Sequence, residues 1–580
     1  MSNQDVTADE GYRRFEEFLD EWSRRDFLRG MGAATAFTVF AAGGMELLAA
    51  CGGGGGGGGQ SSSGTPKKGG HVTEGWAFDI KTFNSMLSQD VYSNLCIGLC
   101  LDSLLTTKAN GDLTSALASE VPKPSSDGLT YTFKLNKNMK WSDGTPLTSD
   151  DVLFTYNLIF APEYQVVASP RRGDFTQHVA TIKAPDPETF VVTTKEPFAP
   201  FLAQHAQYGI LPKHVLGSLQ PAAINTADFN SAPSVGSGPF KFVRWDKGAQ
   251  VVFDRNPNYY RGSVLLDRFV YKVVPSTIAV GNQLKTGEID VGQIDPSQVS
   301  SLQTETGFGI TSFVVPNFQF VMMQLNPDKP AAQILGDKAV RQALVYALNR
   351  EGMVKTANFG QGEVAKSVEP PTSWAANPNT KPAYSYDPSK ANQMLDQAGW
   401  QKGSDGIRAK GGRKMQFTVQ FAVGSPVLQS VAAIMQENWK AVGVGLTTKT
   451  IQFAQLVTLI TDTRDFDMIL VGFNFTQDPD QAQLFSSAGT RPGGFNGFDF
   501  KNDQVDKLLS QAATTVDQNK RKQLYSQYQD IMADQVPAPI LYFLKNNYGV
   551  SKRVQGYGLG TFDQYGTRPW MKDVWVTDGK

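Results

Sequence analysis

The feature that most limits how this chain can fold is a run of eight glycines, Gly52–Gly59, followed closely by Ser61–Ser63. Such residues bury no apolar surface and behave as a flexible coil. A coil of about 15 residues has a root-mean-square length of roughly 20 Å. We therefore expect residues 51–68 to form a linker, with the folded body beginning near Lys67.

The residues before the glycine run have the pattern of an export signal. Arg24 and Arg25 resemble a twin-arginine signal, and the apolar stretch after them ends in "LAAC", which resembles a bacterial lipobox. On this interpretation residues 1–50 are a signal peptide that is cleaved before Cys51, and Cys51 carries a lipid. The alternative is an uncleaved membrane anchor, because an apolar run of about 20 residues can span a bilayer.

The rest of the chain is too long for one hydrophobic core. The whole sequence has 580 residues, of which only the first 68 are assigned to the signal and linker. Single hydrophobic cores stop growing at about 250 to 300 residues. Lys plus Arg (54) nearly equals Asp plus Glu (55), so no excess of charge favours nucleic acid as a partner. Cys96 and Cys100 are four residues apart, on one side of an expected helix, and are interpreted as small buried groups rather than a disulfide or metal pair.

Local patterns predict strands and helices that alternate along the chain, which indicates a mixed α/β protein. Apolar residues alternate over 129–135, as in a strand with one buried face. Thr148 and Asp151 have the spacing of a capping box at the start of a helix. Further expected elements are two strands joined by the turn 246–248, a helix capped by Asp337, and a helix capped by Asp387.

No catalytic motif is found in the sequence. A nucleophile elbow, a P-loop, a zinc-protease helix, an EF-hand loop and a cysteine framework are all absent. In "TQDPDQAQLF", Asp478 and Asp480 fit a turn with a helix cap better than a metal site or a glycosidase acid. We therefore expect no catalytic residues, no metal and no cofactor. The four histidines are scattered: His71, His178, His205 and His214.

Seven stretches, taken in order, carry a resemblance to a known family. They include "DGLTYTFKLNKNMKWSDGTPLTSDDVLFTY", "VGSGPFKFVRWDKGAQVVFDRNPNYYRG", "DKAVRQALVYALNR" and "YDPSKANQMLDQAGW". Over roughly residues 70–575 the chain resembles the solute-binding proteins of peptide- and nickel-type ABC importers, solute-binding protein family 5. The resemblance implies an α/β, bilobal fold like that of periplasmic binding proteins (class II, large three-domain type), with a hinge and a ligand cleft between the lobes.

The same resemblance implies how the chain is divided. Lobe I would comprise residues 69–108, 232–318 and 530–580, with a small domain inserted at 109–231. Lobe II would comprise residues 319–529.

The implied function is a monomeric, extracytoplasmic receptor that is lipid-anchored to the cell membrane, on its periplasmic side or outer face. It would capture a small molecule or peptide and deliver it to ABC permease and ATPase subunits. It would be neither an enzyme nor a nucleic-acid binder. A secreted lipoprotein hydrolase and a chaperone-like peptide binder of the same fold are the alternatives.

The resemblance also implies where ligand binds. The matching strand-end segment is "DFDMILVGFNFTQDPD", with Phe473, Asn474, Phe475 and Asp478 near its end. Dipeptide and oligopeptide binders of the family commonly have an aspartate just before the Asp-Pro pair, which pairs with the peptide's amino terminus. Here Phe475 and Thr476 occupy that place, so the anchor is either missing or displaced to Asp478, and peptides with a free amino group are not favoured as ligands. Trp76 and Phe78 are the expected opposing side, with core packing as the alternative for each aromatic residue.

Overall fold

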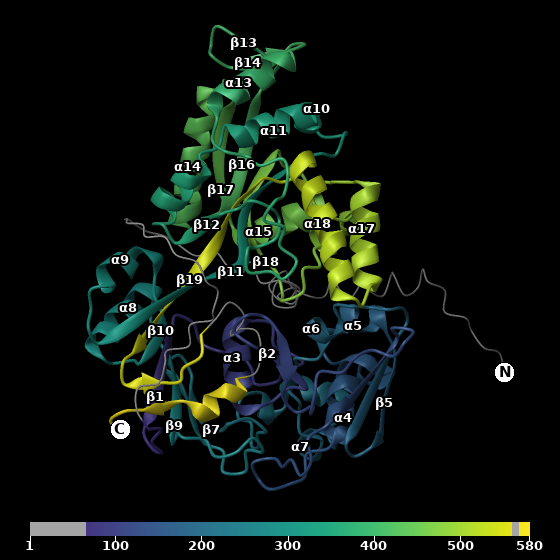
Figure 1. Ribbon diagram of the computed structural model, residues 1–580, viewed down its shortest axis with the longest axis vertical. Helices are drawn as coiled ribbons and strands as arrows, with labels where there is room; N and C mark the ends of the chain where they lie inside the picture. Colours follow the sequence, from purple (N-terminus) through teal and green to yellow (C-terminus); the bar gives the residue numbers. More distant parts are fainter. Residues whose placement is uncertain (1–64, 560–567, 580) are drawn as a thin grey trace, which may run out of the picture.

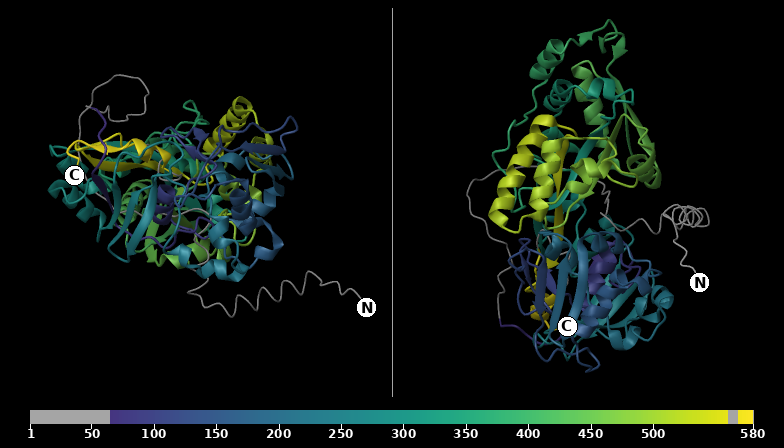
Figure 2. Two further views of the ribbon diagram at one scale, coloured as in Figure 1. Left: turned by 90° about the horizontal axis from the view of Figure 1, so that it is seen from below. Right: turned by 90° about the vertical axis from the view of Figure 1, so that its right-hand side faces the viewer.

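The computed structural model describes residues 65–559 and 568–579. They form two bodies, one above the other, called here the lower body and the upper body (Figure 1, Figure 2). The chain builds most of the lower body first, enters the upper body through the long strand β11 (Phe308–Met323) and returns through β19 (Ile540–Ser551). No helix in these two ranges is long and apolar enough to cross a membrane. Arg24, Arg25 and Cys51, which are predicted to direct export and carry the lipid, lie outside the described residues.

A single sheet of eleven strands runs through both bodies, in the order β17-β16-β18-β11-β19-β10-β1-β9-β8-β7, with β12 paired to β19. Smaller sheets are β4-β6-β5, β13-β14-β15, β2-β3 and β20-β21. The strands are β1 His71–Trp76, β2 Leu105–Thr107, β3 Leu113–Ser115, β4 Thr130–Lys134, β5 Val179–Asp186, β6 Thr189–Thr194, β7 Phe240–Asp246, β8 Gln250–Arg255, β9 Arg268–Val273, β10 Val291–Gln293, β12 Gly362–Val364, β13 Gln401–Lys402, β14 Arg408–Lys410, β15 Arg413–Lys414, β16 Gln416–Ala422, β17 Gly445–Ile451, β18 Met468–Asn474, β20 Val554–Gln555 and β21 Trp575–Val576.

Helices cover both faces of the sheet in the upper body (Figure 1). Along β18 the side chains alternate: Met468 and Leu470 pack with α11, α13 and α14, whereas Ile469, Val471 and Phe473 pack on the side of α17 and α18. The helices are α3 Val91–Cys100, α4 Ser149–Phe160, α5 Arg172–His178, α6 Phe201–His205, α7 Lys213–Leu216, α8 Thr277–Thr286, α9 Val299–Leu302, α10 Ala332–Leu335, α11 Lys338–Tyr346, α12 Arg350–Gly352, α13 Pro388–Gln397, α14 Pro426–Ala441, α15 Phe453–Thr458, α16 Ala482–Phe485, α17 Asp503–Thr514 and α18 Gln518–Gln535.

The locally predicted elements are confirmed. Thr148 and Asp151 form both hydrogen bonds of a capping box at the start of α4. Asp337 and Asp387 cap α11 and α13 through their side chains. Strands β7 and β8 pair across the turn at Gly248, whose φ of 77° is readily adopted by glycine.

Cys96 and Cys100 are both buried and form no disulfide, as expected, and they lie in α3. Two nearby glycines show how tightly this helix end is packed. A Cβ atom on Gly236 would come within 2.5 Å of the Cys100 carbonyl oxygen. A Cβ atom on Gly238 would come within 2.6 Å of the Leu99 carbonyl oxygen. The "VGSGPF" glycines are therefore required for close packing of a loop against α3.

The two crossings between the bodies occur at one level of the sheet. On β11, pairing with β19 stops after Val314↔Lys545 and resumes at Phe318↔Phe543. Residues 315–317 thus lie opposite Leu544 alone, and Leu544 pairs with β12 instead. The ladder is interrupted where the chain passes between bodies.

The position of the two crossings corrects one of the lobe boundaries expected from the sequence. The boundary expected at residue 529 falls inside α18, and Tyr525, Tyr528 and Met532 of that helix all pack in the upper body. Residues of α18 on both sides of residue 529 thus share one core of the upper body. The return crossing is therefore at residues 543–545.

Candidate functional site

The topology directs the carboxyl ends of parallel strands from both bodies toward the crossing level. In the lower body β1 is parallel to β9 and β10, and β10 is antiparallel to β19. In the upper body β16 is parallel to β17 and β18, and β18 is antiparallel to β11, with Asn474 opposite Asn317. Ligands of open α/β sheets bind outside the carboxyl ends of strands. The junction between the bodies is therefore the candidate ligand site.

The lower side of the junction is aromatic. Trp76, at the end of β1, is buried, and its ring lies 5.7 Å from Tyr92, 6.5 Å from Tyr271 and 6.0 Å from Tyr548 between centroids. Its indole nitrogen is buried and has no hydrogen-bond partner in the described part of the chain. Phe78 is 53% exposed and lies 5.0 Å from Tyr92. Phe78 thus offers open apolar surface, and Trp76 offers an unused donor.

The upper side of the junction is also aromatic but is packed more tightly. Phe473 and Phe475 lie 5.0 Å apart between ring centroids, and Phe475 lies 5.2 Å from Phe318 of β11. Phe475 is 8% exposed and Phe473 2%, whereas Asn474 between them is half-buried. Phe475 therefore supports the core as well as bordering the junction, so its truncation to alanine would also lower stability.

The backbone of Phe475 is fixed at the crossing level. Its N–H donates to the Pro316 carbonyl oxygen at 2.9 Å. Pro316 is one of the three β11 residues that have no partner on β19, and proline has no N–H to donate to a ladder. The segment that borders the junction is thus tied to the point where the two bodies connect.

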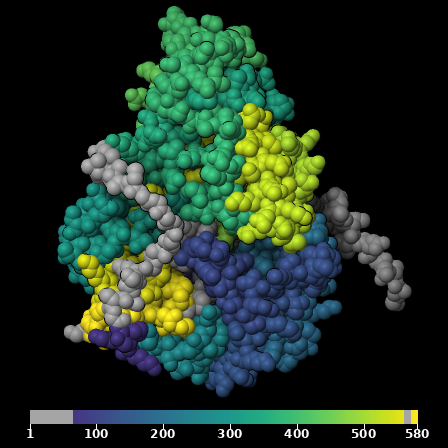
Figure 3. All heavy atoms as spheres, viewed as in Figure 1, coloured from purple at the N-terminus to yellow at the C-terminus, as the bar shows by residue number. Residues whose placement is uncertain are grey.

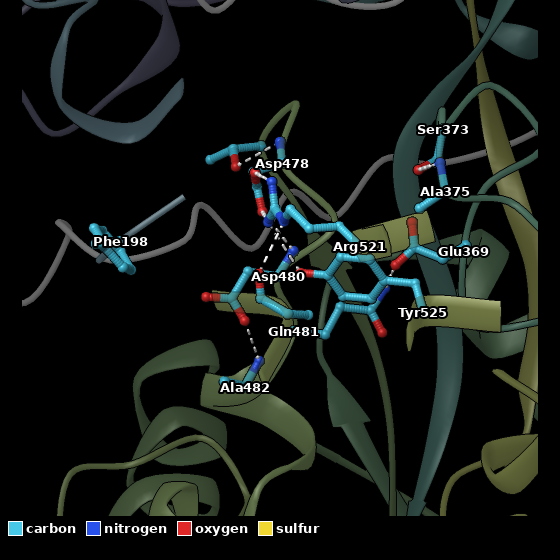
Figure 4. A network of polar contacts seen from close by, with 12 residues as sticks. Phe198, Glu369, Ser373, Ala375, Asp478, Asp480, Gln481, Ala482, Arg521 and Tyr525 are labelled. Atoms are coloured by element: carbon cyan, nitrogen blue, oxygen red, sulfur yellow. Dashed lines mark hydrogen bonds and ion pairs between the residues drawn. The ribbon is translucent and has the colours of Figure 1, made fainter. Parts of the chain in front are cut away.

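Asp478 is fully engaged with Arg521 of α18. The Arg521 guanidinium donates from Nη1 and Nη2 to the two carboxylate oxygens at 2.8 and 2.7 Å, and both side chains are buried. Figure 4 shows this pair, with Arg521 between Asp478 and Tyr525. The guanidinium also lies 5.2 Å above the Trp374 ring. Asp478 is the only carboxylate in residues 473–478, and its oxygens already have strong donors.

Asp478 and Asp480 also form the predicted turn. The Asp480 N–H donates to Asp478 Oδ1 at 3.1 Å, and Asp480 Oδ1 accepts from the Ala482 N–H at the start of α16. Burial, with the Asp478 carboxylate as the second cause, raises the pKa of Asp480 to about 6. Burial also raises the pKa of Glu369 well above its usual range, and Gln481 Nε2 donates to this carboxyl group at 2.7 Å. These acidic groups are parts of the packed upper body.

The raised pKa of Asp480 gives a prediction for Asp480→Asn. A carboxyl group whose pKa is higher in the folded state stabilises the fold when protonated, and this contribution is lost as the pH rises from about 4 to about 6. We expect Asp480→Asn to match the wild type at pH 4 and to be about 1 to 2 kcal/mol more stable at pH 7. This is less than the roughly 2.7 kcal/mol of two full pKa units, because solvent screens the partly exposed side chain. Urea unfolding at both pH values measures it, and equal differences at both would contradict it.

Several junction residues were not found from the sequence. Val423 follows β16 and Phe453 follows β17, and they are 50% and 39% exposed. Their signal was an apolar side chain one or two residues after a strand, which alone does not separate a binding surface from a core. Thr107 and Gln207 of the lower body, and Gln477 and Arg521 of the upper body, carry no sequence signal because their partners are distant in the chain.

His205 and His214 pair with carboxylates of the lower body. Burial lowers the pKa of His205 to about 4, and its Nε2 lies 3.3 Å from an Asp174 carboxylate oxygen in the lower body. His214 pairs with Asp143 at 3.2 Å on the surface. Both have structural partners.

Comparison with known proteins identifies the family. The model of the bacterial extracellular solute-binding proteins, family 5, matches residues 112–495. The chain belongs to this family. The resemblance stated from the sequence is therefore confirmed, and so is the mixed α/β fold of its solved members.

Individual relatives of this solute-binding protein cover most of its length. The oligopeptide-binding protein AppA of Bacillus subtilis is 30% identical over 499 residues, 85% of this chain and 90% of the relative. Its structure in complex with a nonapeptide has a TM-score of 0.71 at 29% identity, covering 88% of this chain and 100% of AppA. NikZ from Campylobacter jejuni, solved with Ni(L-His), has a TM-score of 0.71 at 27% identity, covering 87% of this chain and 99% of NikZ. The dipeptide-binding protein of Escherichia coli is 28% identical, over 75% of this chain and 81% of the relative.

Proposed function

We propose that this protein is the extracytoplasmic substrate-binding protein of an ABC importer and captures a peptide or related small organic solute between its two bodies. It acts by binding alone, without catalysis, and delivers the solute to a permease with its ATPase subunits. The observation that carries the proposal is the meeting of strand carboxyl ends from both bodies at the level of the two crossings. Family membership and the peptide-binding relatives support it.

The interrupted ladder supports a hinge between the bodies. Two crossings, at 314–318 and 543–545, connect them within the described residues. Few backbone bonds must change when such a segment bends, so closure around a ligand is a hinge motion. A ligand favours the closed form only by its difference in affinity for the two forms. Aromatic groups on both sides of the junction can supply that difference when a ligand touches both.

The solute class follows from the upper side of the junction. A ligand ammonium group buried against Phe473 and Phe475 would have no free carboxylate in that segment, because Asp478 is held by Arg521. An unpaired buried charge is costly. We infer that the solute is neutral and apolar at this end, such as a peptide without a free amino terminus.

This inference predicts a preference between matched peptides. Peptides of one sequence, with a free or an N-acetylated amino terminus, are titrated into the protein by calorimetry. The acetylated peptides are expected to bind at least as tightly, because acetylation removes the cost of burying an ammonium group. A tenfold or greater preference for free amino termini would contradict the inferred solute class, but not the receptor function.

Native mass spectrometry of gently isolated protein tests the receptor function. We expect a retained small solute, and a rise in melting temperature when that solute is added back. Incubation with esters, peptides and glycosides is expected to give no turnover, and turnover would favour the hydrolase alternative. Protein that is always empty, with no shift from any peptide or sugar, would contradict transport.

The proposal includes the export and anchoring inferred from the sequence. Arg24 and Arg25 direct export, Cys51 carries the lipid, and residues 51–68 let the body reach a permease in the same membrane. Residues 69–108 and 232–318, with the returning C-terminal segment, form lobe I. Residues 109–231 are its inserted domain, and the upper body is lobe II.

A further inference from the structure

The two bodies also contact each other away from the crossings. Gln477 Nε2, in the upper body, donates to Thr107 Oγ1 at 2.9 Å, and Thr107 Oγ1 donates to Gln207 Oε1 at 2.5 Å, both in the lower body. Gln207 Nε2 donates back to Gln477 Oε1 at 3.5 Å. The three side chains form a closed ring of neutral hydrogen bonds, in which Thr107 and Gln477 are buried.

A backbone hydrogen bond forms a second contact between the same parts of the two bodies. The N–H of Ala199, before α6, donates to the carbonyl oxygen of Ala513 in α17 at 2.7 Å. In Figure 3 the yellow-green surface of α17 and α18 lies directly against the blue surface of the lower body. Backbone and side-chain groups of the two bodies are therefore bonded directly to each other here.

Gln477 is held in place from both sides along the chain. Two residues before it, the Phe475 N–H is bonded to Pro316 at the crossing level. Directly after it, Asp478 is clamped by Arg521. One short segment therefore contains the apolar side of the junction, the link to the hinge and the donor to Thr107.

We propose that Thr107, Gln207 and Gln477 form a latch that favours the closed arrangement of the two bodies before ligand binds. The latch acts on the closure of the two bodies. It rests on the proposed function only because closure would serve to capture the solute. A larger closed fraction raises the apparent affinity, because the ligand binds a state that is already populated. Gln477 thus acts as a positioning residue that sets affinity through closure of the two bodies.

Cysteine cross-linking of the full chain tests the latch without any ligand. Ala199→Cys with Ala513→Cys places two thiols at positions whose backbones are joined by a hydrogen bond of 2.7 Å from the Ala199 nitrogen to the Ala513 oxygen. The native Cys96 and Cys100 are buried. The variants Ala199→Cys and Ala513→Cys, each made alone, reveal any disulfide that an introduced cysteine forms with Cys51. A disulfide between residues 199 and 513 closes a large loop, which a non-reducing gel detects during mild oxidation.

Thr107→Val and Thr107→Ser are then compared in this background. Valine keeps the shape of threonine but removes the hydroxyl group, whereas serine keeps the hydroxyl group. We expect Thr107→Val to slow cross-linking about three- to tenfold, the change that loss of a neutral hydrogen bond produces, and Thr107→Ser to stay within twofold. Gln477→Leu removes the donor from the other body and is expected to match Thr107→Val.

Two results would overturn the latch. The first is that the parent protein with both cysteines forms no cross-link without ligand. The second is that Thr107→Val and Thr107→Ser cross-link at equal rates and Gln477→Leu leaves the cross-linking rate unchanged. Circular dichroism and the melting temperature show that each variant is folded. The outcome is independent of the receptor function, because a protein with no solute can still show a latch, and a receptor can close without one.

Discussion

Replacing Arg521 by methionine is expected to lower the free energy of unfolding by about 3 to 5 kcal/mol. The change keeps the apolar volume of the side chain but leaves the buried Asp478 carboxylate without its two guanidinium donors. Breaking a buried ion pair by removing one partner has a cost of this size, because the remaining charge is uncompensated. Urea unfolding monitored by tryptophan fluorescence measures the change.

An exposed ion pair provides the matched control. Lys338 and Asp534 lie 2.8 Å apart, with both side chains 44% exposed. Lys338→Met is expected to cost less than about 1 kcal/mol, since surface pairs contribute little. Adding Asp478→Asn to Arg521→Met should recover part of the loss. An Arg521→Met protein within 1 kcal/mol of the wild type would show that burial of the pair does not control stability.

Cys51→Ala is expected to move the protein from the membrane fraction to the soluble fraction of the producing cells. The variant cannot be lipidated, and the body beyond the linker contains no apolar helix long enough to hold it in a bilayer among the described residues. Fractionation with immunoblotting, and metabolic labelling with a fatty acid, measure this loss.

Cys96→Ala is the control for Cys51→Ala. Cys96 is buried in α3 and unpaired, so its replacement should leave both membrane association and labelling unchanged. If Cys51→Ala remained membrane-bound and neither protein were labelled, residues 31–50 would be an uncleaved anchor. That result would remove the lipid attachment from the proposal and leave the solute site untouched.

Local structure could be read from the sequence wherever neighbours along the chain decide it. The capping box at Thr148 and Asp151, the caps at Asp337 and Asp387 and the turn at Gly248 all depend on contacts within a few residues. The boundary at residue 529 failed for the opposite reason. Only the packing of Tyr525, Tyr528 and Met532 against distant strands shows which body α18 belongs to.

The candidate site divides in the same way. The family resemblance drew attention to residues 473–478, and it implies that Phe475 and Thr476 stand where peptide binders commonly have an aspartate. Only the tertiary structure decided that Asp478 is held by Arg521, that Phe475 is largely buried and that Gln477 reaches Thr107. These contacts join residues between 43 and 370 positions apart. Burial and pairing at that range depend on how the two bodies pack, which no local pattern encodes.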